Sequence, residues 1–119
     1  MRSLGAIGLT TMILFLITFS SGLLAETGTA VYYSDKFQGR KTASGEIFDQ
    51  NQLTAAHKKL PFGTKVKVIN LENDRSVIVK INDRMATKNS NLIDLTRQAA
   101  KELDFLKQGK ARVNLEVVD

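Results

Sequence analysis

The alternation of apolar and polar residues between positions 64 and 81 constrains the fold of this chain more than any other feature. A period of two residues is typical of a strand with one buried face. The polar residues 72–74 interrupt the alternation and predict a tight turn. The stretch is therefore predicted to be a β-hairpin. Its inward side chains are Val66, Val68, Val77, Val79 and Ile81.

Short strands are predicted elsewhere as well. Residues 27–33 alternate, residues 53–57 are extended, and residues 111–118 close the chain as a strand. The core face of that last strand carries Val113, Leu115 and Val117. Two irregular stretches, residues 34–52 and 85–91, separate these strands. The first is long for a small domain, and its apolar Ile47 and Phe48 favour an ordered loop.

One helix is predicted after the second irregular stretch. Its apolar positions have helical spacing, and Asp94 or Thr96 is expected to cap its first turn. Gly109 is the expected stop. The apolar positions are Leu95, Ala99, Leu103 and Leu106. Five or six short strands with one helix predict a small, mainly β barrel.

The first 25 residues have the order of an export signal. Arg2 is the only charge before Glu26, an apolar run follows it, and small and apolar residues end at Ala25. We therefore predict a signal peptide at residues 1–25 and a domain at residues 26–119. The alternative is a retained membrane anchor, because the apolar run is just long enough to span a bilayer.

The chain has no cysteine and a net charge of +5. Without disulfides, an exported domain of this size depends on its core, which favours a closed sheet over a loop-rich scaffold. The lack of cysteine also excludes a thiol nucleophile and a cysteine-based zinc site. A basic exported domain suits an acidic polymer such as cell-wall glycan. Nucleic acid is not a predicted partner, because the basic residues form no block.

Three titratable residues on separate segments are candidates for one site. Glu46 lies in the long loop, His57 is the only histidine, and Asp83 directly follows an apolar strand. Each also has an ordinary structural explanation: a loop carboxylate, a hydrogen-bonded histidine and a turn-forming aspartate. Two carboxylates and an imidazole can bind a divalent ion, but no ligand-spacing motif is present. No metal or cofactor is predicted.

Several long motifs are typical of one known family. In chain order they are Tyr32–Tyr33, Lys36–Asp49, Leu53–Thr64, Val66–Val68, Asn70–Asn73, Ile81–Arg84, Ile93–Thr96 and Ala99–Ala100. On these residues the chain resembles the RlpA-like double-psi β-barrel family, the rare lipoprotein A group. The resemblance covers nearly all of residues 26–119.

The resemblance implies a six-stranded double-psi β-barrel with one or two short helices and a groove across one face. It also implies an endolytic peptidoglycan lytic transglycosylase of the septal ring, with a preference for glycan strands stripped of stem peptides. The family's functional acid falls on Asp83, and its supporting polar pair falls on Glu46 and His57. Substrate-binding roles are expected for Tyr32, Tyr33, Thr42, Ser44 and Arg84.

The implied reaction cleaves the β-1,4 bond after N-acetylmuramic acid through an oxocarbenium-like state, so the leaving oxygen needs a proton. The sugar's own 6-hydroxyl replaces water as the attacking group and forms a 1,6-anhydro ring. The hypothesis is that Asp83 gives the first proton and then takes the hydroxyl proton. To be protonated near neutral pH, Asp83 would need burial or a neighbouring negative charge. Glu46 is the candidate for that charge. His57 is expected to bond one of the carboxylates and orient the sugar.

Three departures from the family pattern bear on these expectations. Met85–Ala86 stand where the family usually has Gly-Pro, which predicts a different loop beside Asp83. The lipid-attachment cysteine is absent, so the cleaved protein is expected to be soluble in the periplasm or cell wall and not a lipoprotein, at the membrane only if residues 1–25 are retained. A monomer is expected. The C-terminal SPOR domain of many relatives is not expected here, which puts septal targeting in question. The alternative function is a non-catalytic glycan-binding module, as in expansin-like proteins with this fold.

Overall fold

The computed structural model describes residues 25–118, which form six strands and two short helices. The strands are β1 (Ala25–Tyr32), β2 (Thr54–His57), β3 (Lys65–Asn70), β4 (Ser76–Arg84), β5 (Ile93–Leu95) and β6 (Ala111–Val118). The helices are the 3-10 turn η1 (Asp35–Phe37) and α2 (Arg97–Glu102). The predicted signal peptide lies outside the described residues except for Ala25. Between residues 25 and 118, no helix is long and apolar enough to cross a membrane.

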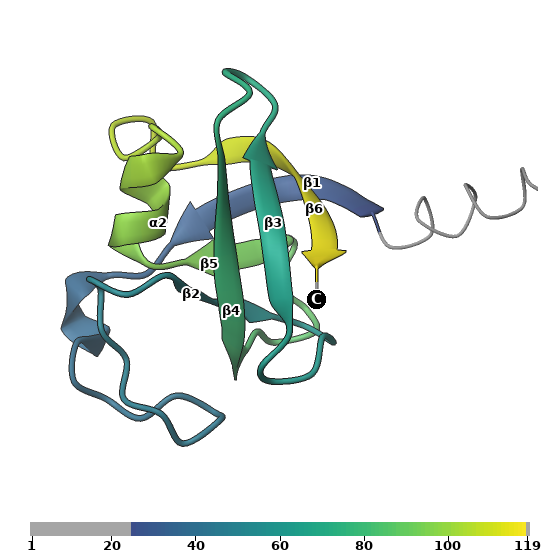
Figure 1. The fold of residues 1–119 in the computed structure, drawn as a ribbon. Coiled ribbons are helices and arrows are strands. Elements are labelled where there is room, and N and C mark those ends of the chain that lie inside the picture. The colour runs from purple at the N-terminus through teal and green to yellow at the C-terminus, as the bar shows by residue number, and fades with distance from the viewer. Residues whose placement is uncertain (1–24, 119) are drawn as a thin grey trace, which may run out of the picture.

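The six strands close into a barrel in the order β1-β5-β2-β4-β3-β6 (Figure 1). The pairs β1–β5 and β2–β4 are parallel, and the remaining neighbours are antiparallel. The predicted hairpin is the β3–β4 pair, in which Val66 lies opposite Val79 and Val68 opposite Val77. The closed, mainly β barrel predicted from the sequence is confirmed.

Apolar side chains from every strand and from the α2 region fill the barrel. The strand residues among them alternate with exposed positions, as a sheet with one buried face requires. Burial of this apolar area is the main stabilising contribution in a chain without disulfides. The fully buried members include Val66, Val68, Ile81, Ile93, Leu95, Leu103, Phe105 and Val113.

Helix α2 starts at the predicted place but is shorter than predicted. The side chain of Thr96 caps it by accepting from the Ala99 N–H, whereas Asp94, the other expected cap, lies in β5. The helix ends at Glu102 and not near Gly109. Asp104 adopts φ 59°, and the Phe105 N–H reaches back to the Ala100 carbonyl. The left-handed backbone of Asp104 and the hydrogen bond from Phe105 to Ala100 terminate the helix.

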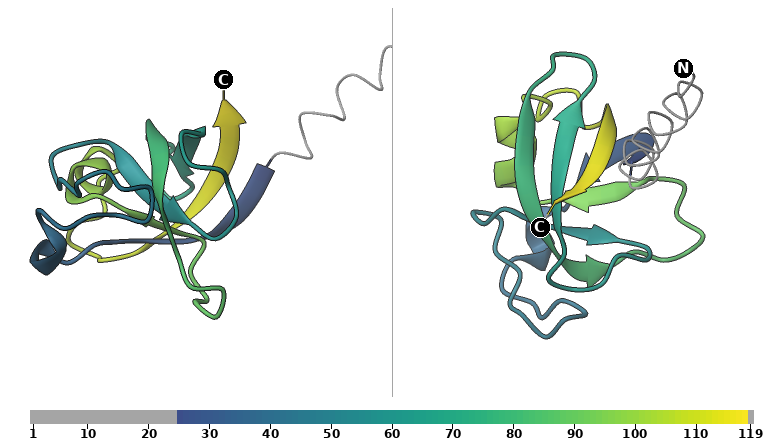
Figure 2. Two further views of the ribbon diagram at one scale, coloured as in Figure 1. Left: turned by 90° about the horizontal axis from the view of Figure 1, so that it is seen from below. Right: turned by 45° about the vertical axis from the view of Figure 1, so that its right-hand side comes forward.

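The loop of residues 33–53 stands out from the barrel, as does the loop of residues 85–92 (Figure 2). The longer loop is ordered, as predicted. Phe48 is buried, and its ring lies 4.3 Å from that of Tyr33. A bridge between Lys41 and Ile47 closes a small turn, in which Gly45 takes φ 94°. The two loops flank the same end of β4.

Candidate active site

A register shift at the end of β4 sets the direction of Asp83. Ala55 pairs with Ile81, but its neighbour Ala56 pairs with Asp83, so Asn82 is the extra residue of β4. Strict alternation would have turned Asp83 to the side of Ile81, which is in the core. The shift turns it to the side of Ala56 instead, away from the core. Such irregularities commonly redirect a side chain beside an active site.

Three hydrogen-bond donors hold the Asp83 carboxylate. The Tyr33 hydroxyl donates to Oδ2 at 2.6 Å, while the backbone N–H groups of Ala43 and Arg84 donate to Oδ1 at 2.8 and 2.9 Å. The donors come from the end of β1, the long loop and β4 itself. Together they fix the orientation of the carboxylate. Burial and the hydrogen bond to Asp83 raise the pKa of Tyr33 well above its ordinary range, so its hydroxyl keeps its proton.

The Asp83 carboxylate lines an open cavity of about 360 Å³ between the two loops. The cavity wall is mixed in character: it contains two aromatic rings, three cationic side chains and two carboxylates. The small Ala56 lies in register with both carboxylate residues. The lining residues are Tyr33, Phe37, Arg40, Lys41, Ala56, Asp83, Arg84, Met85, Asn89 and Asp94.

Asp94 is the second carboxylate of this cavity. It lies opposite Ala56 on β5, just as Asp83 lies opposite Ala56 on β4, so all three face the same side of the sheet. Its Oδ1 is buried and has no hydrogen-bond partner among residues 25–118. Burial, and secondarily the charge of Asp83, raise the pKa of Asp94 to about 6. Asp94 therefore holds a proton closer to neutral pH than an ordinary aspartate does.

Glu46 does not line the cavity. Its two oxygens accept from Lys80 at 2.9 Å and from the Asn82 amide at 3.0 Å. These bonds, that of Lys80 foremost, lower the pKa of Glu46 below its ordinary value. Glu46 is thus an ionised side chain that holds the residue preceding Asp83, and its negative charge is balanced by Lys80.

Thr42 and Ser44 shape the turn that precedes Glu46. Their hydroxyls lie 2.9 Å apart, and that of Thr42 also donates to the Glu46 carbonyl at 3.0 Å. The Ser44 N–H donates to the Asn82 carbonyl at 3.2 Å, which ties the turn to β4. Neither residue lines the cavity. Their arrangement presents the Ala43 N–H to Asp83.

His57 lies on the other face of β2 from Ala56. It is buried, and its Nδ1 accepts from the N–H groups of Lys59 and Leu60, both at 3.1 Å. This places the ring proton on Nε2, which donates to Glu26 at 2.9 Å. The imidazole therefore pairs with a carboxylate of β1 that the sequence did not single out, and not with Glu46 or Asp83.

Arg84 connects the His57 segment to the site. Its guanidinium donates to the carbonyls of His57 and Leu60, at 3.0 and 2.8 Å, and lies 4.4 Å from the Phe62 ring. Met85 follows it and lines the cavity as a buried side chain. Glu46 and His57 thus hold the two residues that flank Asp83, one through Asn82 and the other through Arg84.

The two tyrosines predicted to bind substrate point to different sides. Tyr33 lines the cavity and bonds Asp83. Tyr32 packs against the core, where its hydroxyl donates to the Leu106 carbonyl at 2.8 Å and its ring lies 6.0 Å from that of Phe105. Adjacent residues of a strand face opposite sides, so only one of the pair reaches the site.

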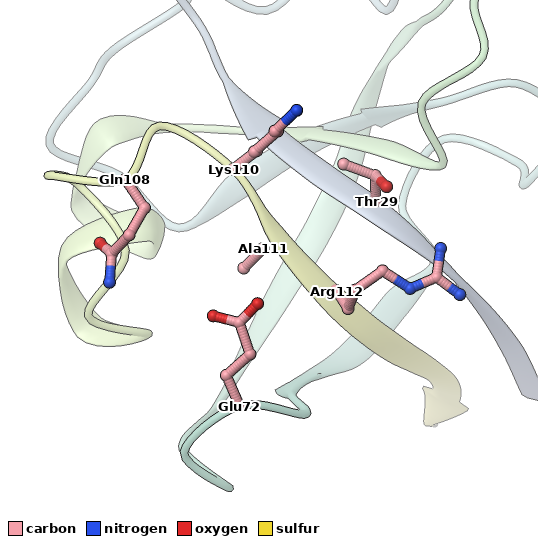
Figure 3. Close-up of a pocket in the computed structure, with 6 residues that line it drawn as sticks. All are labelled: Thr29, Glu72, Gln108, Lys110, Ala111 and Arg112. Carbon is pink, nitrogen blue, oxygen red and sulfur yellow. The ribbon is translucent and has the colours of Figure 1, made fainter.

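A second hollow of about 380 Å³ lies on the β1–β6 side of the barrel (Figure 3). Lys110 and Arg112 of the β6 region and Glu72 of the β3–β4 turn line it, but none of the predicted site residues does. Size alone does not distinguish it from the Asp83 cavity. The paired carboxylates do. No group of three or more metal-ligating side chains occurs in the described part of the chain.

The fold and this site together define a class of protein: a closed six-stranded barrel with an aspartate at the mouth of a polar cleft. A family model described as "Lytic transglycolase" matches residues 25–115. The chain belongs to this family of double-psi β-barrel domains.

Curated relatives agree with this assignment. The chain is 49% identical over 102 residues to a "Probable endolytic peptidoglycan transglycosylase RlpA" of Treponema pallidum, covering 85% of this chain and 32% of that protein. It is 48% identical over 91 residues to the "Endolytic peptidoglycan transglycosylase RlpA" of Campylobacter jejuni, covering 76% and 33%. The chain therefore spans about a third of the length of these relatives.

Solved structures show the same fold. Streptomyces papain inhibitor superimposes with a TM-score of 0.65 at 25% identity, covering 80% of this chain and 94% of the inhibitor. An expansin of Clavibacter michiganensis superimposes with a TM-score of 0.63 at 19% identity, covering 80% and 50%. The six-stranded double-psi β-barrel implied by the sequence resemblance is confirmed.

Proposed function

We propose that this chain is an endolytic lytic transglycosylase that cleaves the β-1,4 bond after N-acetylmuramic acid in peptidoglycan. The observation that carries the proposal is Asp83, an oriented carboxylate at the wall of an open cavity. Membership of the lytic transglycolase family and the names of the relatives support the same reaction. Peptidoglycan glycan strands are the proposed substrate.

The cavity suits the chemistry of this bond. The positive charge that develops on the sugar ring during cleavage is stabilised by a nearby anion, and the Asp83 carboxylate lies at the cavity wall where it can supply that charge. The same carboxylate is placed to accept the proton of the sugar's 6-hydroxyl as that oxygen attacks C1. Arg40, Lys41 and Arg84 surround the site with positive charge, which suits the lactyl and peptide carboxylates of peptidoglycan.

The proposal is tested by digesting purified sacculi with the wild-type protein and with Asp83→Asn. Mass spectrometry of the soluble products measures 1,6-anhydro-muropeptides. Wild type is expected to release them, and the variant at least about 100-fold fewer, because Asn cannot accept the proton. Asn keeps the oxygen that accepts from the Ala43 and Arg84 N–H groups, and its amide can donate to the Tyr33 oxygen, so an unchanged melting temperature is the control. Equal release by the variant, or none by wild type, would refute the enzyme proposal.

A second digestion uses glycan strands whose stem peptides have been removed by an amidase. We propose that these strands are the preferred substrate and that the activity serves cell-wall remodelling at the septum. Faster release from the stripped strands than from intact sacculi supports the preference. Equal rates on both substrates contradict it.

The alternative of a non-catalytic glycan-binding module is distinguished by the same materials. Retention of the wild-type protein on insoluble peptidoglycan without any anhydro product favours the binding module. Cleavage by wild type that is lost in Asp83→Asn, while retention persists, favours the enzyme. The similarity to an expansin structure concerns the fold alone and does not decide between the two.

We also propose that the protein acts outside the cytoplasm, as a monomer in the periplasm or cell wall. The basic start, apolar run and small residues of positions 1–25 support export, and peptidoglycan is found only there. N-terminal sequencing of protein recovered from its host tests the predicted cut after Ala25. An intact Met1 would favour the membrane-anchored form instead.

A further inference from the structure

The proposed reaction needs a proton donor as well as a base. The leaving oxygen must be protonated while the 6-hydroxyl loses its proton. The three donors around Asp83 suit a carboxylate that accepts, and Glu46 is ionised and lies outside the cavity. His57 faces the opposite side of β2. None of the three predicted residues therefore supplies a ready proton at the cavity wall.

We propose that Asp94 is the proton donor of the reaction and that Asp83 is its base, an inference that rests on the proposed transglycosylase function. Both side chains line the cavity, and both lie in register with Ala56, one on each neighbouring strand. Ala56 lies between the two carboxyl groups, and its side chain is a single methyl group. It therefore leaves the space between them open. The Oδ1 of Asp94 is buried and has no hydrogen-bond partner within residues 25–118, so it is the oxygen that we assign to carry the proton.

The step balances without any further reactant. Asp94 gives its proton to the glycosidic oxygen as the bond from C1 to that oxygen breaks, and N-acetylglucosamine leaves with a hydroxyl group. The 6-hydroxyl oxygen attacks C1, forms the anhydro ring and passes its proton to Asp83. Asp83 is then protonated and Asp94 is ionised. Proton transfer from Asp83 to Asp94 through the open cavity restores the starting state.

The charge environment of Asp94 supports this division of roles. Burial and the Asp83 carboxylate raise its pKa to about 6, whereas the ordinary value is 3.8. Among the residues of β2, only Ala56 lines this cavity. The titratable and charged groups that share the cavity with Asp94 are Tyr33 after β1, Arg40 and Lys41 of the long loop, and Asp83 and Arg84 of β4.

A pH dependence of definite sign follows. The donor is protonated below about pH 6 and loses its proton above it. The rate of anhydro-muropeptide release should therefore be high below about pH 6 and fall by up to tenfold per pH unit above it. The amide of Asp94→Asn holds no transferable proton, so this variant should be about 100-fold slower at pH 5.5 and lack that fall.

The experiment measures initial release rates from sacculi between pH 4.5 and pH 8 for wild type, Asp94→Asn and Asp104→Asn. Asp104 is an exposed residue beyond α2 with φ 59°, which Asn also tolerates, so the same chemical change there is the control and should leave the profile unchanged. Melting temperatures and retention on peptidoglycan show whether each variant is folded and binds substrate.

A second arm follows the side-chain carboxyl carbon of Asp94 by NMR in wild type and in Asp83→Asn. Removal of the Asp83 charge should lower the pKa of Asp94. An active Asp94→Asn variant with the wild-type pH profile would overturn the inference and leave the proposed function standing. An Asp94 titration that does not move in Asp83→Asn would also overturn it. An inactive wild type would refute the proposed function itself, and with it the proton-donor role.

Discussion

Tyr33 shows how one residue connects the loop, the strand and the acid. Its ring lies against Phe48, which anchors the long loop, and its hydroxyl donates to Asp83 at 2.6 Å. It is also buried enough for that bond to be shielded from water, which strengthens the electrostatic contribution. At the scale of the residue, Tyr33 is the main side-chain determinant of where the Asp83 carboxylate points.

Tyr33→Phe is expected to slow anhydro-muropeptide release roughly tenfold. The variant keeps the ring packing but removes one hydrogen bond to a charged group, which contributes about 1.5–3 kcal/mol. The matched control is Tyr32→Phe, because the hydroxyl of Tyr32 donates to the Leu106 carbonyl on the core side. That control should lower the free energy of unfolding by about 1 kcal/mol and leave the rate unchanged. Equal rates in wild type and Tyr33→Phe would remove Tyr33 from the site.

The sequence was sufficient to place Asp83 at the end of a strand, because an acid that follows an alternating apolar run marks a strand end. It was not sufficient to show the partners of His57, because the pairing with Glu26 depends on the β1–β5–β2 arrangement of the closed barrel. Asp94 was taken only as a possible helix cap. An acid between two inward apolar residues, Ile93 and Leu95, is the signal that would have indicated a strand residue facing the site.

At the scale of the elements, the strands that carry the two carboxylates are fixed by different means. The β3–β4 hairpin was predictable from its alternation, whereas the register shift beside Asp83 was not, because alternation carries no information on an inserted residue. Strand β5 has only three residues and depends on α2 beyond it. Thr96 joins the two: it caps the helix, and its hydroxyl donates to the Gln52 carbonyl at 2.6 Å.

Thr96→Val is expected to lower the free energy of unfolding by about 1–3 kcal/mol. The variant retains the shape of the buried side chain but loses the helix cap and leaves the Gln52 carbonyl without its partner. Thr27→Val is the matched control, because Thr27 donates its hydroxyl to Asn114 at an exposed position. Chemical denaturation measures both. Equal stabilities of the two variants would show that Thr96 does not fix the start of α2.

At the scale of the whole molecule, the absence of cysteine and the short alternating strands favoured a closed barrel, because a closed sheet buries its apolar strand faces and leaves no exposed edge. The family resemblance implied six strands in a double-psi barrel, whereas their order, β1-β5-β2-β4-β3-β6, was not predicted and is seen only in the structure. Closure has a functional consequence. It places β4 and β5, which are consecutive in the chain but not paired with each other, on either side of β2, and so brings Asp83 and Asp94 to one cavity.

The measurement that tests the proposed reaction most directly is digestion of sacculi by the wild-type protein in water enriched in heavy oxygen. A lytic transglycosylase uses the sugar's own 6-hydroxyl, so its products should be 1,6-anhydro-muropeptides that carry no heavy oxygen from the solvent. A hydrolase puts one water oxygen on each new reducing end. Reducing ends that carry heavy oxygen, or no soluble product at all, would contradict the proposed function.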